Sequence, residues 1–285
     1  MKLGLIGKAI AQSKMPALQR LAGARTDHAL SYVLLDLASD DPSLFERTFT
    51  ACREEGFRGV NVTHPFKELA ARRVAIEDPL VRAIGAVNTV LFGADRARGF
   101  NTDHSGFLRA WRRRFGGRLP GRVAVIGTGG VGRAISFALV ALEASEIRLF
   151  DIEPEKARAL ADALRGIDPE SGIVIASGCD QAVSGADGIV NGTPIGMYYK
   201  SGCPVPPASI GGQRWVFDAV YTPLETELLR HASDRRIETF SGFELFLGQG
   251  ADAFEIFTGI RLSDGDVAAI ERDIRAGIGS PSRAS

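Results

Sequence analysis

Short apolar runs alternate with amphipathic segments of helical length along almost the whole chain. Apolar runs bounded by glycine and polar residues are typical of buried strands, and apolar positions three or four residues apart are typical of helices. The expected strands lie at 3–6, 29–35, 86–92, 97–101, 123–126, 146–150, 173–176, 188–190, 215–220 and 238–240, and one more ends at 63. The expected helices lie at 42–54, 105–115, 133–142, 153–164, 224–232 and 243–257, and one more begins at Pro16. This alternation predicts an α/β fold with a mostly parallel sheet that helices cover on both faces.

The segment 123–132 joins an apolar, β-branched run to a glycine loop, and a helical segment follows directly. Gly127 permits the tight turn, Gly129 lets the backbone approach a pyrophosphate, and Gly132 lets helix and strand pack closely. The N–H groups at the helix N-terminus face the bound anion. A glycine turn can also be purely structural, but the strand–turn–helix context favours a dinucleotide site.

Asp151 ends the next expected strand after the glycine loop. A carboxylate at this place accepts hydrogen bonds from the ribose hydroxyls of the cofactor and repels a 2′-phosphate. The sequence therefore favours NAD over NADP.

The length of 285 residues is enough for about two domains. Because the 34 basic and 34 acidic residues cancel, no global field attracts nucleic acid or an anionic membrane. Cys52, Cys179 and Cys203 are too few and too scattered for a disulfide framework or a zinc site. No apolar run is long enough for a signal peptide or a membrane span. We expect a cytoplasmic protein without a metal, and we interpret the arginines of segment 105–115 as a solvated helix face rather than a nucleic-acid site.

Several polar residues near expected strand ends are candidates for chemistry. If Pro65 lies in the first turn of the helix that follows Thr63, then Lys67 lies in that turn too, where the helix dipole opposes a cation. Most lysines are nevertheless solvated surface groups. Ser13 fits a helix cap as well as a substrate contact, and Asp103 fits an N-cap as well as a ligand.

Eight short segments, in this order, together resemble the shikimate/quinate dehydrogenase family over nearly the whole chain. They are 13–16, 61–67, 85–89, 101–103, the glycine loop, 191–197, 218–223 and 248–249. The resemblance implies a smaller α/β substrate-binding catalytic domain at 1–104 and a doubly wound, Rossmann-type NAD domain at 105–240. The C-terminal helices, 241–285, then return to the substrate domain.

The resemblance also implies roles for single residues. Lys67 matches the catalytic lysine and Asp103 its partner, and a positioned acid/base of this kind contributes about 10²–10⁴-fold to rate. The implied substrate contacts are Ser13, Thr63, Asn88, Tyr221 and Gln249. The implied cofactor contacts are Gly127, Gly129, Gly130, Val131, Gly132, Asp151, Thr193, Gly196 and Met197.

Three positions depart from the family pattern. Met15 stands where a second hydroxyl residue usually holds the substrate carboxylate, and a thioether cannot donate a hydrogen bond. Either another donor such as Lys14 compensates, or the substrate differs at that end. Ile152 stands where NADP-using members have arginine. His104 replaces a common glycine and either narrows the site or caps a helix.

The expected function is hydride transfer between NAD and a ring secondary alcohol of a shikimate- or quinate-like hydroxy carboxylic acid. The expected partners are small molecules, and the protein is expected to be a monomer or a homodimer. A catalytically silent regulatory protein that binds NAD or a metabolite is the alternative. Another two-domain dehydrogenase, acting on folates or amino acids, is disfavoured by segment 61–67.

Overall fold

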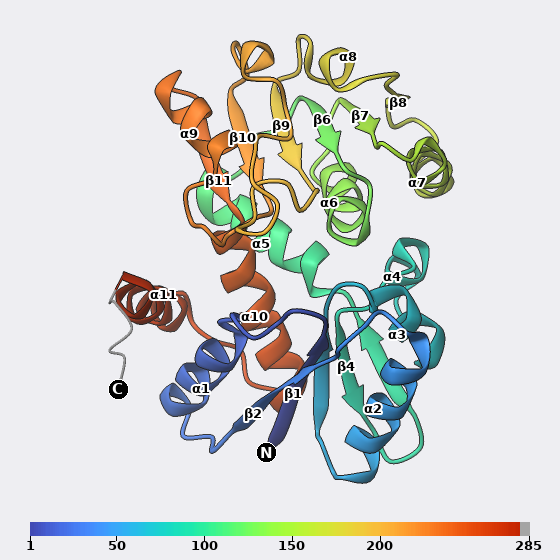
Figure 1. Cartoon of the computed structure of the whole chain (residues 1–285), viewed down its shortest axis with the longest axis vertical. Coiled ribbons are helices and arrows are strands. Elements are labelled where there is room, and N and C mark those ends of the chain that lie inside the picture. The colour runs from blue at the N-terminus through green and yellow to red at the C-terminus, as the bar shows by residue number, and fades with distance from the viewer. Residues whose placement is uncertain (280–285) are drawn as a thin grey trace. The chain divides into compact units, whose positions relative to one another are not determined.

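The computed structural model describes residues 1–279 and divides into two compact units (Figure 1). Unit 1 comprises Met1–Thr102 and resumes at Gln249, and unit 2 comprises Asp103–Gly248. The expected limits fell at 104/105 and 240/241. The limits of the two units lie instead inside the helices α5 (Thr102–Phe115) and α10 (Gly242–Thr258), and the predicted domain limits stay a prediction.

Unit 1 has a five-stranded sheet in the order β2-β1-β3-β4-β5. Its strands are β1 (Lys2–Gly7), β2 (Ser31–Asp36), β3 (Gly59–Val62), β4 (Thr89–Phe92) and β5 (Ala97–Phe100). The first three strands are mutually parallel, and β4 is antiparallel to both of its neighbours. The sheet is therefore mixed, which departs locally from the mostly parallel arrangement that the sequence predicted.

Helices cover both faces of this sheet. The helices of the unit are α1 (Met15–Arg25), α2 (Pro42–Glu54), α3 (Lys67–Arg73), α4 (Pro79–Ile84), the part of α10 from Gln249 onward, and α11 (Asp264–Gly279), which contacts α1. On one face, Phe45 of α2 stacks on Phe66 in a core that includes Val60 and Val62. On the other face α10 lies so close that a Cβ on Gly59 would meet the Phe257 ring at 2.6 Å. Neither α4 nor α11 was predicted from the sequence.

Unit 2 has a six-stranded, all-parallel sheet in the order β11-β10-β9-β6-β7-β8. Its strands are β6 (Arg122–Ile126), β7 (Glu146–Phe150), β8 (Ile173–Ile175), β9 (Gly188–Asn191), β10 (Trp215–Asp218) and β11 (Glu238–Ser241). Counted within the unit, this order is 3-2-1-4-5-6, the doubly wound order of dinucleotide-binding folds. The direction of winding reverses between β6 and β9, and ligands bind at the carboxyl edge of such a switch point.

Alternating side chains of the unit 2 strands point to opposite faces. Phe217 meets Phe107 of α5 edge-on, whereas its neighbour Val216 lies in the core with Leu228 and Leu229. The helices of the unit besides α5 are α6 (Gly130–Ala141), α7 (Pro154–Ile167), α8 (Cys179–Val183) and α9 (Glu227–Asp234). The helix α9 begins three residues later than expected because the Thr226 hydroxyl caps it, accepting from the Leu229 N–H.

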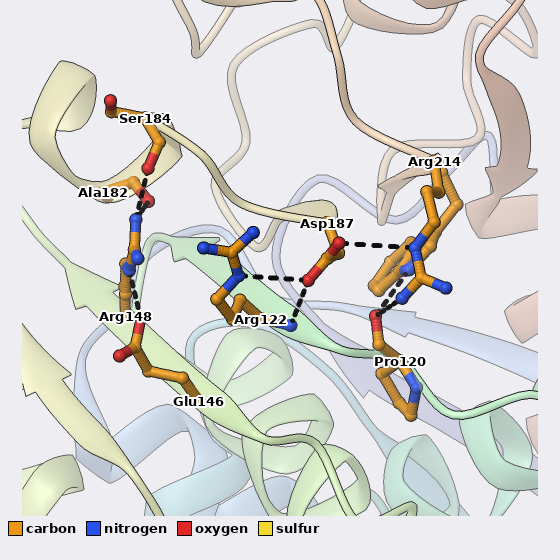
Figure 2. Close-up of polar contacts among 9 residues, drawn as sticks. Pro120, Arg122, Glu146, Arg148, Ala182, Ser184, Asp187 and Arg214 are labelled. Atoms are coloured by element: carbon orange, nitrogen blue, oxygen red, sulfur yellow. Dashed lines mark hydrogen bonds and ion pairs between the residues drawn. The ribbon is translucent and has the colours of Figure 1, made fainter.

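Ion pairs join the amino ends of the unit 2 strands, on the edge opposite the switch point (Figure 2). Asp187, just before β9, accepts from the Arg122 backbone N–H at 2.9 Å and pairs with the Arg214 guanidinium at 3.4 Å. Hydrogen bonds from Arg122, through its backbone first, hold the pKa of Asp187 below its ordinary value. Arg214 and Trp215 both donate to the Pro120 carbonyl. These contacts fasten β6, β9 and β10 at their starts.

Within residues 1–279 no helix is long and apolar enough to cross a lipid bilayer.

Candidate active site

One edge of the unit 1 sheet brings together Thr63, Lys67 and Asn88. Thr63 directly follows β3 and Asn88 directly precedes the antiparallel β4, so both lie at the same edge. The Val62 N–H donates to the Asn88 carbonyl at 2.8 Å, and the Val87 N–H donates to the Lys67 carbonyl at 2.9 Å. Backbone hydrogen bonds therefore fix these three predicted residues as neighbours.

Lys67 is the first residue of α3, as predicted, and its side chain is half-buried. The prediction for Pro65 is wrong, because α3 starts two residues after it, with Phe66 at the N-cap position. Asp103 and His104 lie inside the first turn of α5, which starts at Thr102, so neither caps that helix. Asp103 is buried and is the first residue of unit 2. Lys67 belongs to unit 1, and the pairing of the two therefore stays a prediction.

Asn88 is 4% exposed, and its side chain serves the fold and the site at once. Its Oδ1 accepts from the Thr102 N–H at 2.8 Å and from the hydroxyls of Thr102 and Thr89, both at 3.1 Å. Its Nδ2 donates to Oε1 of Gln249 on α10, at 3.4 Å. Two predicted substrate contacts, Asn88 and Gln249, thus meet within unit 1.

A second buried amide supports this edge and was not predicted. Asn61, 5% exposed, donates to the Thr89 hydroxyl at 2.9 Å and accepts from the Tyr32 hydroxyl at 2.7 Å. An asparagine in a strand whose other residues are apolar was the available signal, since a buried amide must find partners. Its partners lie 28 and 29 residues away in the chain and are visible only in the fold.

The loop after β1 positions Ser13. Its Oγ accepts from the Met15 N–H at 3.3 Å at the start of α1, although Lys14 is the formal N-cap residue and has no side-chain cap bond. Ser13 is half-buried, so a role at the helix start and a role in binding are both compatible with its position. Met15 is 7% exposed, and its sulfur accepts from Nε2 of buried Gln19 at 3.7 Å. Its thioether therefore packs against the interior of unit 1.

The glycine loop of unit 2 fits a pyrophosphate. Gly127 has φ +88°, and Gly132 packs so closely on it that a Cβ would collide with the Gly127 carbonyl. By contrast, a Cβ on Gly129 would meet nothing within 4 Å, so this stretch of backbone is open to a ligand. The helix α6 begins at Gly130, followed by Val131, and no side chain caps it. Its first N–H groups are therefore available to an anion.

Asp151 lies beside this loop at the carboxyl end of β7. Its Oδ2 accepts from the Thr128 N–H at 2.7 Å and the Thr128 hydroxyl at 2.9 Å, and its Oδ1 accepts from the Glu153 N–H at 2.9 Å. Burial raises the pKa of Asp151, but the hydrogen bonds from Glu153 and Thr128 outweigh it, and the net pKa lies below the ordinary value. The next side chain, Ile152, is 86% exposed and carries no charge.

Thr193 follows β9 and lies against the glycine loop, where a Cβ on Gly127 would meet its methyl group at 2.5 Å. Gly196 and Met197, further along the same loop, line a cavity of about 240 Å³ together with Thr226. Tyr221 follows β10 and stacks its ring on Phe246, with 5.1 Å between the ring centroids. These residues all belong to unit 2.

One further residue, Asp218, has a place in unit 2 that was not predicted from the sequence. Asp218, at the end of β10, is fully buried and accepts from Nδ2 of Asn191 at 2.8 Å, the Val220 N–H at 2.9 Å and the Thr226 hydroxyl at 2.6 Å. Burial raises the pKa of Asp218 to about 6, although these hydrogen bonds oppose the rise. An aspartate at the end of an apolar strand was the only signal in the sequence.

Taken by itself, unit 2 has the strand order, glycine loop and acidic residue of a dinucleotide-binding fold, which defines the chain as an α/β protein with a Rossmann-type domain. Residues 5–90 match the family model for the shikimate dehydrogenase substrate binding domain. A quinate/shikimate dehydrogenase (NAD(+)) of Corynebacterium efficiens is 34% identical over 263 residues, which are 90% of this chain and 93% of the relative. The chain therefore belongs to the shikimate/quinate dehydrogenase family.

Two further relatives span the chain almost completely. A shikimate dehydrogenase (NADP(+)) of Streptomyces avermitilis is 38% identical over 261 residues, 90% of each chain. The solved structure of a quinate dehydrogenase from Corynebacterium glutamicum in complex with NAD has a TM-score of 0.85 and 31% identity. That comparison covers 97% of this chain and 99% of the other. Both nicotinamide cofactors therefore occur among the relatives.

Proposed function

We propose that the protein transfers a hydride between NAD and a ring secondary alcohol of a shikimate- or quinate-like hydroxy carboxylic acid. The chain is an NAD(P)-dependent oxidoreductase acting on a CH–OH group, as its curated relatives are. The relatives give no support to the alternative of a silent regulatory protein. The observation that carries the proposal is the hydrogen-bonded edge of unit 1, where backbone bonds bring Lys67 close to Thr63 and Asn88, and Asn88 donates to Gln249.

The cofactor fits the residues of unit 2. We assign the pyrophosphate to the N–H groups at the start of α6, because Gly129 leaves the backbone accessible and no side chain competes for those donors. Thr193, Gly196 and Met197 are assigned to the same ligand. When bound, the nicotinamide accepts the hydride from the alcohol or returns it to the ketone.

The preference for NAD is assigned to Asp151 and Ile152. The hydrogen bonds from Thr128 and Glu153 keep the Asp151 carboxylate ionised at neutral pH, which suits ribose hydroxyls and opposes a 2′-phosphate. Ile152 offers no positive charge for that phosphate. Lys156 lies nearby, but it pairs with Glu153 at 2.5 Å.

The proton step is assigned to Lys67. As the alcohol is oxidised its hydroxyl loses a proton, which the Lys67 amine accepts, and in the reverse direction the ammonium returns it. Asp103 is assigned the task of orienting the ammonium group.

The ring hydroxyls are assigned to Thr63, Asn88, Gln249 and Tyr221, because amides and hydroxyls can both donate to and accept from them. Ser13 is assigned to the carboxylate. The inward-packed Met15 gives it no second donor, so either Lys14 supplies one or the substrate carries a different group at that end.

A steady-state screen tests the proposal by crossing quinate, shikimate and related hydroxy acids with NAD and NADP. We expect turnover with at least one ring hydroxy acid and a higher kcat/KM with NAD than with NADP. Absence of turnover with every ring acid would contradict the substrate class. Equal kcat/KM with the two cofactors would contradict the assignment of Asp151.

A further inference from the structure

We propose that Asp218 is a positioning residue that holds the segment 191–193 against the glycine loop and thereby sets the affinity for the nicotinamide cofactor. The inference rests on the proposed cofactor site. Asp218 itself is fully buried, and its hydrogen bond to Asn191 links it to Thr193.

The sheet register places the three parts side by side. Asn191 pairs with Ile126, the last residue before the glycine loop, on one side and with Asp218 on the other. The carboxyl ends of β6, β9 and β10 are therefore adjacent. Only one strand, β9, separates the end of β10 from the glycine loop that follows β6.

Asp218 determines which way the Asn191 amide points. The Nδ2 group donates to Oδ1 of Asp218 at 2.8 Å and to the Ile195 carbonyl at 3.0 Å. This orientation leaves Oδ1 of Asn191 to accept from the N–H and the hydroxyl of Thr193, at 2.9 and 2.7 Å. A carboxylate can only accept, so it enforces this orientation, whereas a donor at position 218 would favour the flipped amide.

The segment 191–193 has almost no room to move. A Cβ on Gly192 would lie 2.6 Å from the Gly127 carbonyl and 2.8 Å from Cα of Gly132. Thr193 in turn presses its methyl group on Gly127. If the Asn191 amide rotates, Thr193 loses its acceptor, and the displaced segment disturbs the two glycines that shape the loop.

The negative charge of Asp218 contributes to the positioning of Asn191. Hydrogen bonds to a charged acceptor are roughly twice as strong as neutral ones, so protonating Asp218 loosens the hold on Asn191. The titratable groups at this corner are Cys203, from the loop after β9, and Glu227, at the start of α9, which lies near Cys203. Burial, together with the charges of Glu227 and Asp218, raises the pKa of the Cys203 thiol, which stays neutral between pH 5 and 8.

The experiment measures the NADH dissociation constant by nucleotide fluorescence between pH 5 and pH 8, and kcat at saturating cofactor. For Asp218→Leu, which removes every acceptor but keeps the branching of the side chain at Cγ, we expect a Kd about tenfold higher at pH 8. For Asp218→Asn, which imitates the protonated acid, we expect about threefold. Its Kd at pH 8 should match that of the wild type at pH 5 and change little with pH. Saturating NADH should restore kcat in both variants.

Glu227→Gln is the matched control, because it removes a carboxylate from the same corner without touching the network around Asn191. We expect it to keep the wild-type Kd and pH profile. Asp218→Leu with wild-type affinity, or a pH profile that Glu227→Gln abolishes and Asp218→Asn retains, would overturn the inference.

The wild-type profile needs no substitution and remains decisive if Asp218→Leu does not fold. A wild-type NADH affinity that is constant from pH 5 to pH 8 would contradict the role of the charge. Absence of NADH binding by the wild type would overturn the cofactor proposal as well. Binding by the wild type with an unchanged affinity in both Asp218 variants would overturn this inference alone.

Discussion

Asn88 in unit 1 and Asp218 in unit 2 occupy similar places at the edges of their sheets, but they fasten those edges differently. Both are buried, and each accepts three hydrogen bonds from neighbouring strand ends and helix starts. Asn88 is neutral and still donates to Gln249, a proposed substrate contact. Asp218 is titratable, and the residues assigned to the cofactor lie between it and the proposed ligand.

This difference separates the two edges functionally. In unit 1 a single side chain, that of Asn88, both joins the chain segments at the edge of the sheet and contacts Gln249, the proposed substrate residue. Its loss should therefore affect both stability and substrate binding. In unit 2 the fastening residue and the ligand residues are distinct, so the two effects can be separated. The proton chemistry, by contrast, is assigned to Lys67, whose backbone carbonyl is part of the unit 1 edge.

Lys67→Ala should give the largest change. Removing the proposed general acid/base should lower kcat by about 10²–10⁴-fold, because proton transfer then depends on water. The backbone bond from Val87 to the Lys67 carbonyl does not need the side chain, so the fold should persist. The checks are steady-state kinetics, NADH affinity and circular dichroism, with Lys8→Ala as a control at another lysine. An intact Lys67→Ala protein whose kcat stays within about tenfold of the wild type would remove Lys67 from the mechanism.

Asn88→Ala should give the next largest effect, on stability. It leaves the buried Thr102 N–H and two hydroxyls without their acceptor, which should lower the free energy of unfolding by about 3 kcal/mol. Chemical denaturation measures the loss. Gln249→Ala is the matched comparison, since it breaks only the 3.4 Å contact. It should cost less than about 1 kcal/mol of stability but raise the substrate KM by about tenfold. Equal destabilisation by the two variants would contradict the difference drawn between these residues.

Asp218→Asn should change how stability depends on pH. The folded-state pKa of Asp218 is raised to about 6 from an ordinary value of 3.8, so the folded protein binds the proton more tightly than the unfolded chain. The contribution of Asp218 to stability is therefore full below pH 3.8, falls as the pH rises toward 6, and is constant above. The variant has no carboxyl group at position 218, so its stability does not decrease through this ionisation as the pH rises. Its free energy of unfolding relative to the wild type should rise by about 2 kcal/mol between pH 4 and pH 6.5. Denaturation at a series of pH values tests this, and a difference that falls over the same interval would have the wrong sign.

The glycine loop and Asp151 were predictable from the sequence because they obey local rules. A left-handed φ at Gly127 and a close approach at Gly132 exclude residues other than glycine, so the glycines in the sequence reveal the backbone geometry. The first-turn position of Lys67 was predicted for the same kind of reason, although Pro65 does not begin the helix.

The buried polar residues that join strand ends, such as Asp218 and Asn61, were not predictable because their partners are remote in the sequence. The partner of Asp218 is decided by the register of β9 and β10, and Asn61 meets Tyr32 across an intervening strand. The inward direction of Met15 likewise depends on Gln19 and on the carbonyl of Gly250, which accepts from Gln19 at 2.9 Å. Pattern and propensity describe one element at a time, and these contacts exist only between elements.

The smallest predicted effect concerns the choice of cofactor in unit 2. Asp151→Asn combined with Ile152→Arg removes a charge that repels a 2′-phosphate and adds one that attracts it. The Asn amide can still accept from Thr128, which should preserve the loop. We expect the ratio of kcat/KM for NADP to that for NAD to rise by about tenfold, mainly through KM. Ile152→Arg alone should shift the ratio less, since the Asp151 carboxylate would pair with the new guanidinium. If the double variant lost affinity for both cofactors equally, Asp151 would act through the loop rather than by selecting between ribose and phosphate.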